Sequence, residues 1–241
     1  TTEYTATYTG GDLDSDGYNP MESMMNEWEQ ANSSYTFFKL PASTTAEKSY
    51  ADPDNYRDNE FGIYKLTSWP SEISSSALAV TQYFANRVNS GQSNEYLEII
   101  ESDILVNAEH HTFTLDQSDV TAYDFHTVIL HELGHFLGLL HQTDAAIPSI
   151  MYPSLGKAEA QRNLEAWDTN AIIDNYATVS AFQSGFTHAL TGDDFDEDYT
   201  DEPQRSGEVV RGILELRADG QCYHYINNKF THVHTVDLKR K

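Results

Sequence analysis

The sequence predicts an α+β protein with a β-rich extension at its end, and three observations support this class. Segments with strand-like and helix-like patterns both occur within residues 1–177. A run of acids follows at 193–202, and strand-like stretches occur again beyond it. The length of 241 residues suits one domain of ordinary size with an appendage, or two small domains.

Each expected element rests on a local pattern. Strand-like segments lie at residues 2–9, 35–40, 61–66, 77–84, 98–108, 209–216 and 222–226. Helical patterns lie at residues 21–31, 125–137 and 163–176. Pro20 suits the start of the first helix. The second helix has the strongest pattern, and its apolar face, with Ile129, Leu133, Phe136 and Leu140, should anchor it against a core.

The chain is strongly acidic, with 38 Asp and Glu against 14 Lys and Arg and a net charge of −24. Such a surface repels nucleic acid and anionic membranes, because phosphate binding needs Lys and Arg. The charge either keeps the protein soluble or includes carboxylates that bind Ca²⁺. No apolar run is long enough to cross a bilayer, and the lone Cys222 excludes an intrachain disulfide.

Charge also divides the chain into three expected parts. Residues 1–177 form the main domain. Residues 178–203 form an acidic linker, because seven of the ten positions at 193–202 are acids. Residues 204–241 form a basic C-terminal extension that carries seven basic and four acidic side chains.

The stretch from His131 to His141 has the spacing of a metal site. His131 and His135 are four residues apart, so a helix projects both from one face. Gly138 can adopt a positive φ and end the helix, which turns His141 back toward the same ion. Three neutral imidazoles leave a fourth position of Zn²⁺ open, as in catalytic sites. Glu132 can then reach a water on the metal without ligating it.

This stretch, with Ser149-Ile150-Met151-Tyr152-Pro153 following it, resembles the metzincin metallopeptidases, whose motif H-E-x-x-H-x-x-G-x-x-H precedes a Met-turn. Four further features are similar to the matrixins, particularly their bacterial members: the Met-Tyr-Pro triplet, Glu101-Ser102-Asp103-Ile104, Trp69-Pro70 followed by residues 77–81, and Asp168. The resemblance covers roughly residues 20–177.

The resemblance implies a metzincin-type catalytic domain, with a twisted, mixed five-stranded sheet and two long helices. It implies that Met151 forms a hydrophobic floor under the imidazoles, and that Tyr152 is either an oxyanion donor or structural. The strand from Ile104 to Ala108 would be the edge strand over the cleft, and a protein or peptide substrate would add to it in extended form. A secreted monomer is expected, from which a signal peptide has already been removed.

The implied activity is that of a zinc-dependent endopeptidase, in which Glu132 activates the zinc-bound water that attacks a peptide carbonyl. The alternative is a metal-containing binding or adhesion module without catalysis. A closed structural site uses four protein ligands and needs no Glu132, so the sequence favours the enzyme. The His/Asp cluster that holds a structural zinc in many matrixins is reduced here to His110 and His111.

Two weaker signals leave alternatives open. Asp12, Asp14 and Asp16 resemble the start of a Ca²⁺ loop, and an acidic turn that caps the next helix explains them equally well. Cys222 is either a buried small residue or a thiolate that ligates the zinc and keeps the enzyme latent. His224, His232 and His234 in the same extension could act similarly.

Overall fold

The computed structural model describes residues 6–9, 20–38, 43–45, 56–57, 61–92, 96–183, 205–218, 221–226 and 229–235. The helices in this part of the chain are α1 (Pro20–Ala31), α2 (Phe125–Phe136) and α3 (Ala166–Gln183). The strands are β1 (Ala6–Thr9), β2 (Ser43–Thr45), β3 (Phe61–Leu66), β4 (Ala77–Val88), β5 (Tyr96–Asn107), β6 (Phe113–Thr114), β7 (Tyr123–Asp124), β8 (Arg205–Arg217), β9 (Gln221–Ile226) and β10 (Lys229–Thr235).

The predicted α+β class is confirmed. One eight-stranded mixed sheet has the order β10-β9-β8-β4-β5-β3-β1-β2, and β6 and β7 form a separate pair. Five of its strands, β1 to β5, come from the main domain, and the other three come from the extension. Residues 35–37, expected in a strand, adopt no regular structure, and α3 continues to Gln183, past the expected domain boundary at residue 177.

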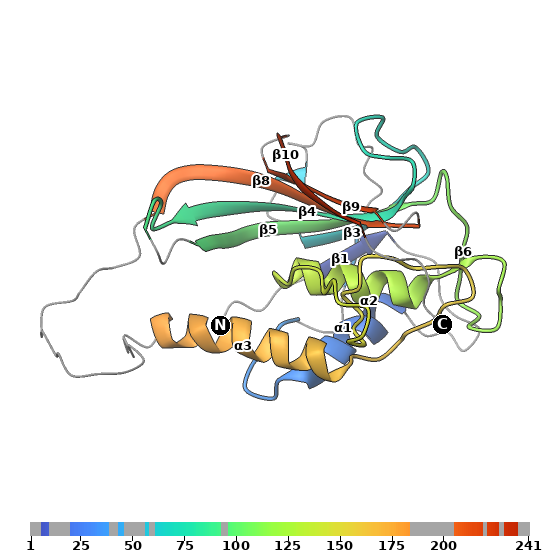
Figure 1. The fold of residues 1–241 in the computed structure, drawn as a ribbon, viewed down its shortest axis with the longest axis horizontal. Helices are drawn as coiled ribbons and strands as arrows, with labels where there is room; N and C mark the ends of the chain where they lie inside the picture. Colours follow the sequence, from blue (N-terminus) through green and yellow to red (C-terminus); the bar gives the residue numbers. More distant parts are fainter. Residues whose placement is uncertain are drawn as a thin grey trace, which may run out of the picture.

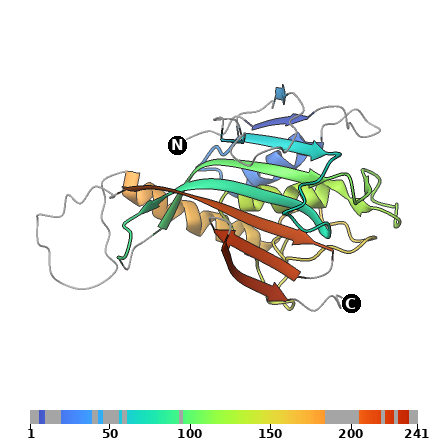
Figure 2. The same cartoon turned by 90° about the horizontal axis from the view of Figure 1, so that it is seen from above.

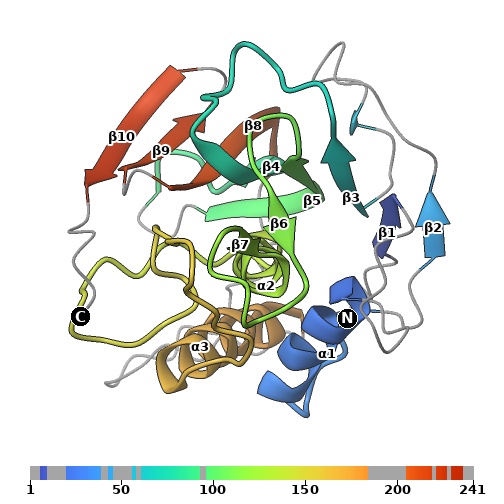
Figure 3. The same ribbon diagram turned by 90° about the vertical axis from the view of Figure 1, so that its right-hand side faces the viewer.

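The three helices lie on one face of the sheet, with α2 directly under its centre (Figures 1 and 3). The largest core cluster fills the space between them, and Trp28, Ile129 and Leu133 are all buried in it. Leu140, which the sequence places on the same apolar face, is instead 62% exposed, because α2 ends at Phe136. Because side chains alternate along a strand, the neighbour of Ile104 on β5 faces the opposite side and joins a second cluster there. Among the described residues, no helix combines the length and apolar character that a membrane crossing requires.

The prediction that residues 104–108 form the edge strand over the cleft is wrong. They lie mostly in β5, which pairs in parallel with β3 on one side and antiparallel with β4 on the other. The β4–β5 hairpin explains this arrangement, because it places β4 on the side of β5 away from β3. Its turn contains Asn89 (φ 54°) and Gly91 (φ 79°), both in the left-handed region.

The extension is part of the main sheet. Strand β8 runs antiparallel along β4, with Arg217 opposite Ala77 at one end and Arg205 opposite Val88 at the other. Strand β9 pairs antiparallel with β8, and β10 with β9. From above, β8 lies beside β4 along the length of the sheet (Figure 2). Strand β4, which would otherwise border the sheet on this side, is therefore internal.

Candidate metal centre

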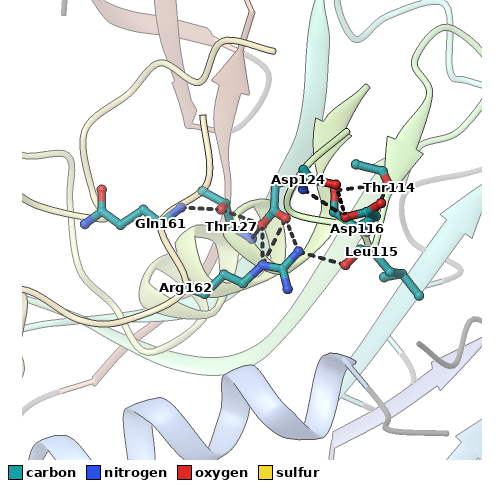
Figure 4. Close-up of polar contacts among 8 residues, drawn as sticks. Thr114, Leu115, Asp116, Asp124, Thr127, Gln161 and Arg162 are labelled. Atoms are coloured by element: carbon teal, nitrogen blue, oxygen red, sulfur yellow. Dashed lines mark hydrogen bonds and ion pairs between the residues drawn. The ribbon is translucent and has the colours of Figure 1, made fainter. Parts of the chain in front are cut away.

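The N-terminus of α2 is fixed by a polar network that also reaches the loop before α3. Asp124 is the N-cap, and its Oδ1 accepts hydrogen bonds from the Thr127 backbone N–H (2.8 Å) and hydroxyl (2.7 Å). Arg162 pairs with the same carboxylate, with Nε 3.0 Å from Oδ2, and donates to the Leu115 carbonyl at 2.8 Å (Figure 4). The Gln161 N–H donates to the Thr127 hydroxyl at 2.8 Å, so this loop is held against the helix start.

The three predicted histidines converge on one point. His135 Nε2 lies 2.9 Å from His141 Nε2, which lies 3.3 Å from His131 Nε2. Three nitrogens bound to one tetrahedral Zn²⁺ at ordinary bond lengths would lie about 3.3 Å apart. Among the described residues, these three side chains are the only group of metal-ligating type that comes together in this way.

Hydrogen bonds at the far side of two rings determine which nitrogens can bind a metal. His131 Nδ1 lies 2.7 Å from the Ile150 carbonyl, and His135 Nδ1 lies 2.8 Å from the Leu139 carbonyl. Because a carbonyl oxygen only accepts, each Nδ1 carries the proton, and each neutral ring presents the lone pair of Nε2. At least two lone pairs therefore point to the same place, and a cation there would satisfy them.

Gly138 makes the sharp turn that the sequence predicts. Its φ of +91° is costly for any residue with a side chain, and its N–H donates to the His135 carbonyl at 2.8 Å. The Leu139 N–H donates to the Gly134 carbonyl at 2.9 Å, which places the Leu139 carbonyl beside His135 Nδ1. One turn therefore directs the chain toward His141 and orients the ring of His135.

The segment from Ser149 to Pro153 passes beneath α2 and is held by Asp168. Met151 is fully buried, and a Cβ added to Gly134 would lie only 2.3 Å from its sulfur. Asp168, at the start of α3, accepts hydrogen bonds from the Ser149 hydroxyl (2.5 Å) and the Ile150 N–H (3.0 Å). Because the Ile150 carbonyl accepts from His131, this buried carboxylate indirectly positions a metal-facing ring.

Glu132 lies in the interior between α2 and β4. The Thr81 hydroxyl of β4 donates to its Oε2 at 2.5 Å, whereas Oε1 has no hydrogen-bond partner among the described residues. Burial raises the pKa of Glu132 to about 8, the Thr81 hydrogen bond opposes this shift, and the charge of Glu215 adds to it. A divalent cation beside the carboxyl group would lower that pKa, because it favours the charged form.

A pocket of about 250 Å³ opens beside His131. Residues that line it come from three segments: α2, residues 149–161 and β8 of the extension. They include Thr127, His131, Tyr152, Leu155, Gln161 and Leu216. The pocket therefore lies directly against the histidine cluster, and Tyr152 is a buried part of its wall.

Several predicted site residues lie elsewhere. Asp12, Asp14 and Asp16 are outside the described residues, so the calcium site stays a prediction. Cys222 and His224 lie on β9, and the backbone register pairs them with His234 and His232 of β10. Strand β8 separates β9 from β4, and a role of these residues in latency also stays a prediction. His110 and His111 follow β5, where they bond to Asn107 and to the Ser75 carbonyl.

Sequence reasoning missed four residues that build this site: Thr81, Asp124, Arg162 and Leu216. The sequence gives only a weak signal for Thr81, which is a polar residue at the end of the apolar run from Ala77 to Val80. The structure shows that Thr81 is fully buried. Asp124 has the residue type of an N-cap just before a strong helix pattern, so its role could have been found. Arg162 and Leu216 reach the site only through tertiary contacts.

The matrixin family model matches residues 92–177. The matched span contains β5, α2 with the three histidines, the segment around Met151 and the first part of α3. No curated protein matches this chain. The matrixin resemblance seen in the sequence is confirmed for this span.

Proposed function

We propose that the chain is a zinc-dependent endopeptidase, because residues 92–177 match the matrixin family model. The observation that carries this proposal is the convergence of three imidazole nitrogens beside a buried, partly unpaired Glu132 carboxyl group. His131, His135 and His141 would hold the ion. When bound there, zinc supplies Lewis-acid chemistry, which polarises a carbonyl and makes water more acidic.

Glu132 is the proposed general base. Its Oε2 is fixed by Thr81, so the carboxyl group has one defined orientation, and Oε1 remains available to accept a proton from water. The same oxygen can then deliver that proton to the amine nitrogen that leaves as the peptide bond breaks. Thr81 positions this carboxyl group and takes no part in the proton transfer itself.

The proposed substrate is a protein segment in extended conformation. Strand β4 borders the site, because its Thr81 contacts Glu132, and an extended peptide beside β4 would pass close to the histidines. The pocket beside His131 would accept one substrate side chain. Backbone hydrogen bonds to a strand give affinity with little sequence dependence, which suits cleavage of many proteins.

The alternative, a binding or adhesion module that keeps the metal for structure, predicts different behaviour of Glu132 variants. The test measures zinc content and cleavage of an unfolded protein by the full chain and by Glu132→Gln. The endopeptidase should bind one zinc in both forms, and the variant should lose about 100-fold or more in rate. Equal cleavage rates would exclude Glu132 as the base.

A further inference from the structure

Strand β8 occupies the side of β4 that faces the proposed cleft. The register places Leu214 opposite Thr81 and Leu216 opposite Ala79. Because the Thr81 hydroxyl contacts Glu132, the stretch from Leu214 to Leu216 passes beside the proposed base. Strand β8 also contacts α2, the helix that carries Glu132. In the view along the sheet, β8 lies next to β4 above α2 and α3 (Figure 3).

The same stretch is bounded on its other side by the segment after Met151. Arg217 forms a parallel bridge with Ser154, whereas β8 is antiparallel to β4. Leu216 lines the pocket beside His131 and is only 1% exposed. An extended chain therefore runs between two backbone segments and places a leucine side chain at the pocket, as expected of a bound peptide.

The burial of the site follows from this arrangement. His131 and Glu132 are 1% and 0% exposed. Glu132 contacts Thr81 of β4, and His131 lines the same pocket as Leu216 of β8. The backbone groups of β4 that point toward β8 are used in the ladder from Ala77 to Val88. A second extended chain cannot pair with this side of β4 while β8 occupies it, although the register shifts between Ala77 and Ala79 and between Asn86 and Val88.

We propose that residues 205–217 are a tethered competitor of substrate, so that the enzyme cleaves other proteins only when β8 leaves β4. This inference rests on the proposed peptidase function. The competitor belongs to the same chain, so its local concentration is high and does not depend on dilution. The ion pair of Glu215 and Arg217, with Oε2 and Nε 2.8 Å apart, lies within this strand, so the two charges are buried as a neutralised pair when β8 is docked.

One variant should release the strand. Leu216→Asp places a charge at a buried position against the pocket, whereas Ser206→Asp adds the same charge at the exposed end of β8. Loss of the buried leucine should shift the docking equilibrium about ten- to a hundredfold. Cleavage of an unfolded protein by the zinc-loaded full chain should rise about tenfold or more for Leu216→Asp and remain unchanged for Ser206→Asp.

A second variant should lock the strand. Asn86 and Val209 are direct partners on β4 and β8, at a separation that antiparallel pairing makes suitable for a disulfide. Asn86→Cys with Val209→Cys, made in a Cys222→Ser background, should cleave substrate at least about tenfold more slowly when oxidised, and reduction should restore the rate. Each single-cysteine variant, treated with the same reductant, controls for effects of reduction on the metal site.

Binding of a peptide hydroxamate separates this inference from the proposed function. Its affinity for the zinc-loaded protein should fall in the oxidised double-cysteine variant and rise in Leu216→Asp. If hydroxamate affinity increases from the oxidised double-cysteine variant to the unmodified protein to Leu216→Asp, but no form cleaves protein, then β8 covers the cleft and the peptidase proposal fails. If affinity and cleavage are equal in the locked, unmodified and Leu216→Asp proteins, β8 is only a structural strand and the inference is overturned.

Discussion

Replacement of Asp168 by alanine should weaken both the fold and the metal site, although this residue contacts no metal-ligating histidine and does not itself line the pocket. Its carboxylate accepts hydrogen bonds from the Ser149 hydroxyl and from the Ile150 and Glu165 backbone N–H groups. The side chain is fully buried, so water cannot replace it without rearrangement. Asp168→Ala therefore leaves two backbone donors without an acceptor.

The magnitude follows from those two donors. The buried Ile150 donor that loses its acceptor costs about 1–3 kcal/mol. The Glu165 N–H lies at the exposed start of α3 and loses a cap that water can partly replace, which adds about 1 kcal/mol, so the expected loss of folding free energy is about 2–4 kcal/mol. For a chain of this size, that loss lowers Tm by about 4–16 °C. The Ile150 carbonyl, which orients His131, moves with the same loop, and outer partners of this kind change metal affinity by about 10–100-fold.

The assay combines thermal unfolding with competition for zinc against a chelator of known affinity. Asn170→Ala is the matched control, because Asn170 lies on the same helix and is exposed. The control should leave Tm within about 2 °C of the unmodified protein, since surface substitutions usually change stability by less than 0.5 kcal/mol. Zinc affinity and Tm of Asp168→Ala that match those of the control would refute the reasoning.

Three further variants test the other parts of the site. His141→Ala should lower zinc affinity by at least about tenfold, and unchanged metal content on dialysis would show that another group supplies the third ligand. Arg162→Ala should destabilise the protein by about 2–4 kcal/mol in denaturant titrations, because it leaves the buried Asp124 carboxylate without its cation. Arg162→Lys should be destabilised less than Arg162→Ala but more than the unmodified protein, because lysine keeps the charge and loses the two-pronged contact. Gly134→Ala should cost about 1–3 kcal/mol, since the added methyl group meets Met151, and a normal Tm would contradict that crowding.

The histidine cluster could be predicted from the sequence because local geometry determines most of it. His131 and His135 share a helix, and the helical repeat alone brings their rings to one face. Gly138 is the one nearby residue that adopts a positive φ without strain, so the direction of the chain toward His141 is also encoded locally. The helix that contains them has an N-cap residue and an unbroken apolar face.

The order of the strands could not be predicted in the same way, because the pattern of one strand does not identify its partner. Residues 104–108 are mostly apolar on both faces, a pattern that fits an internal strand. The same pattern does not exclude an edge strand, and the resemblance to matrixins placed these residues at the edge. The residues 209–216 were expected to form a strand, but nothing in their own pattern indicates that β4 is the neighbour. Leu216 and Thr81 join the site through this pairing, so both were missed.

The position of β8 also changes where the sheet is exposed. Without the extension, β4 would present a long row of unpaired backbone groups directly beside the site. Such an edge attracts any extended chain, including another copy of the same protein. With β8, β9 and β10 in place, the sheet instead ends at β10 and β2, the two strands farthest from β4 and β5 in its order. The strand with which an extended substrate would pair is therefore β4, the same strand whose exposed edge would promote association between copies. Pairing of β8 with β4 both blocks substrate and protects this edge.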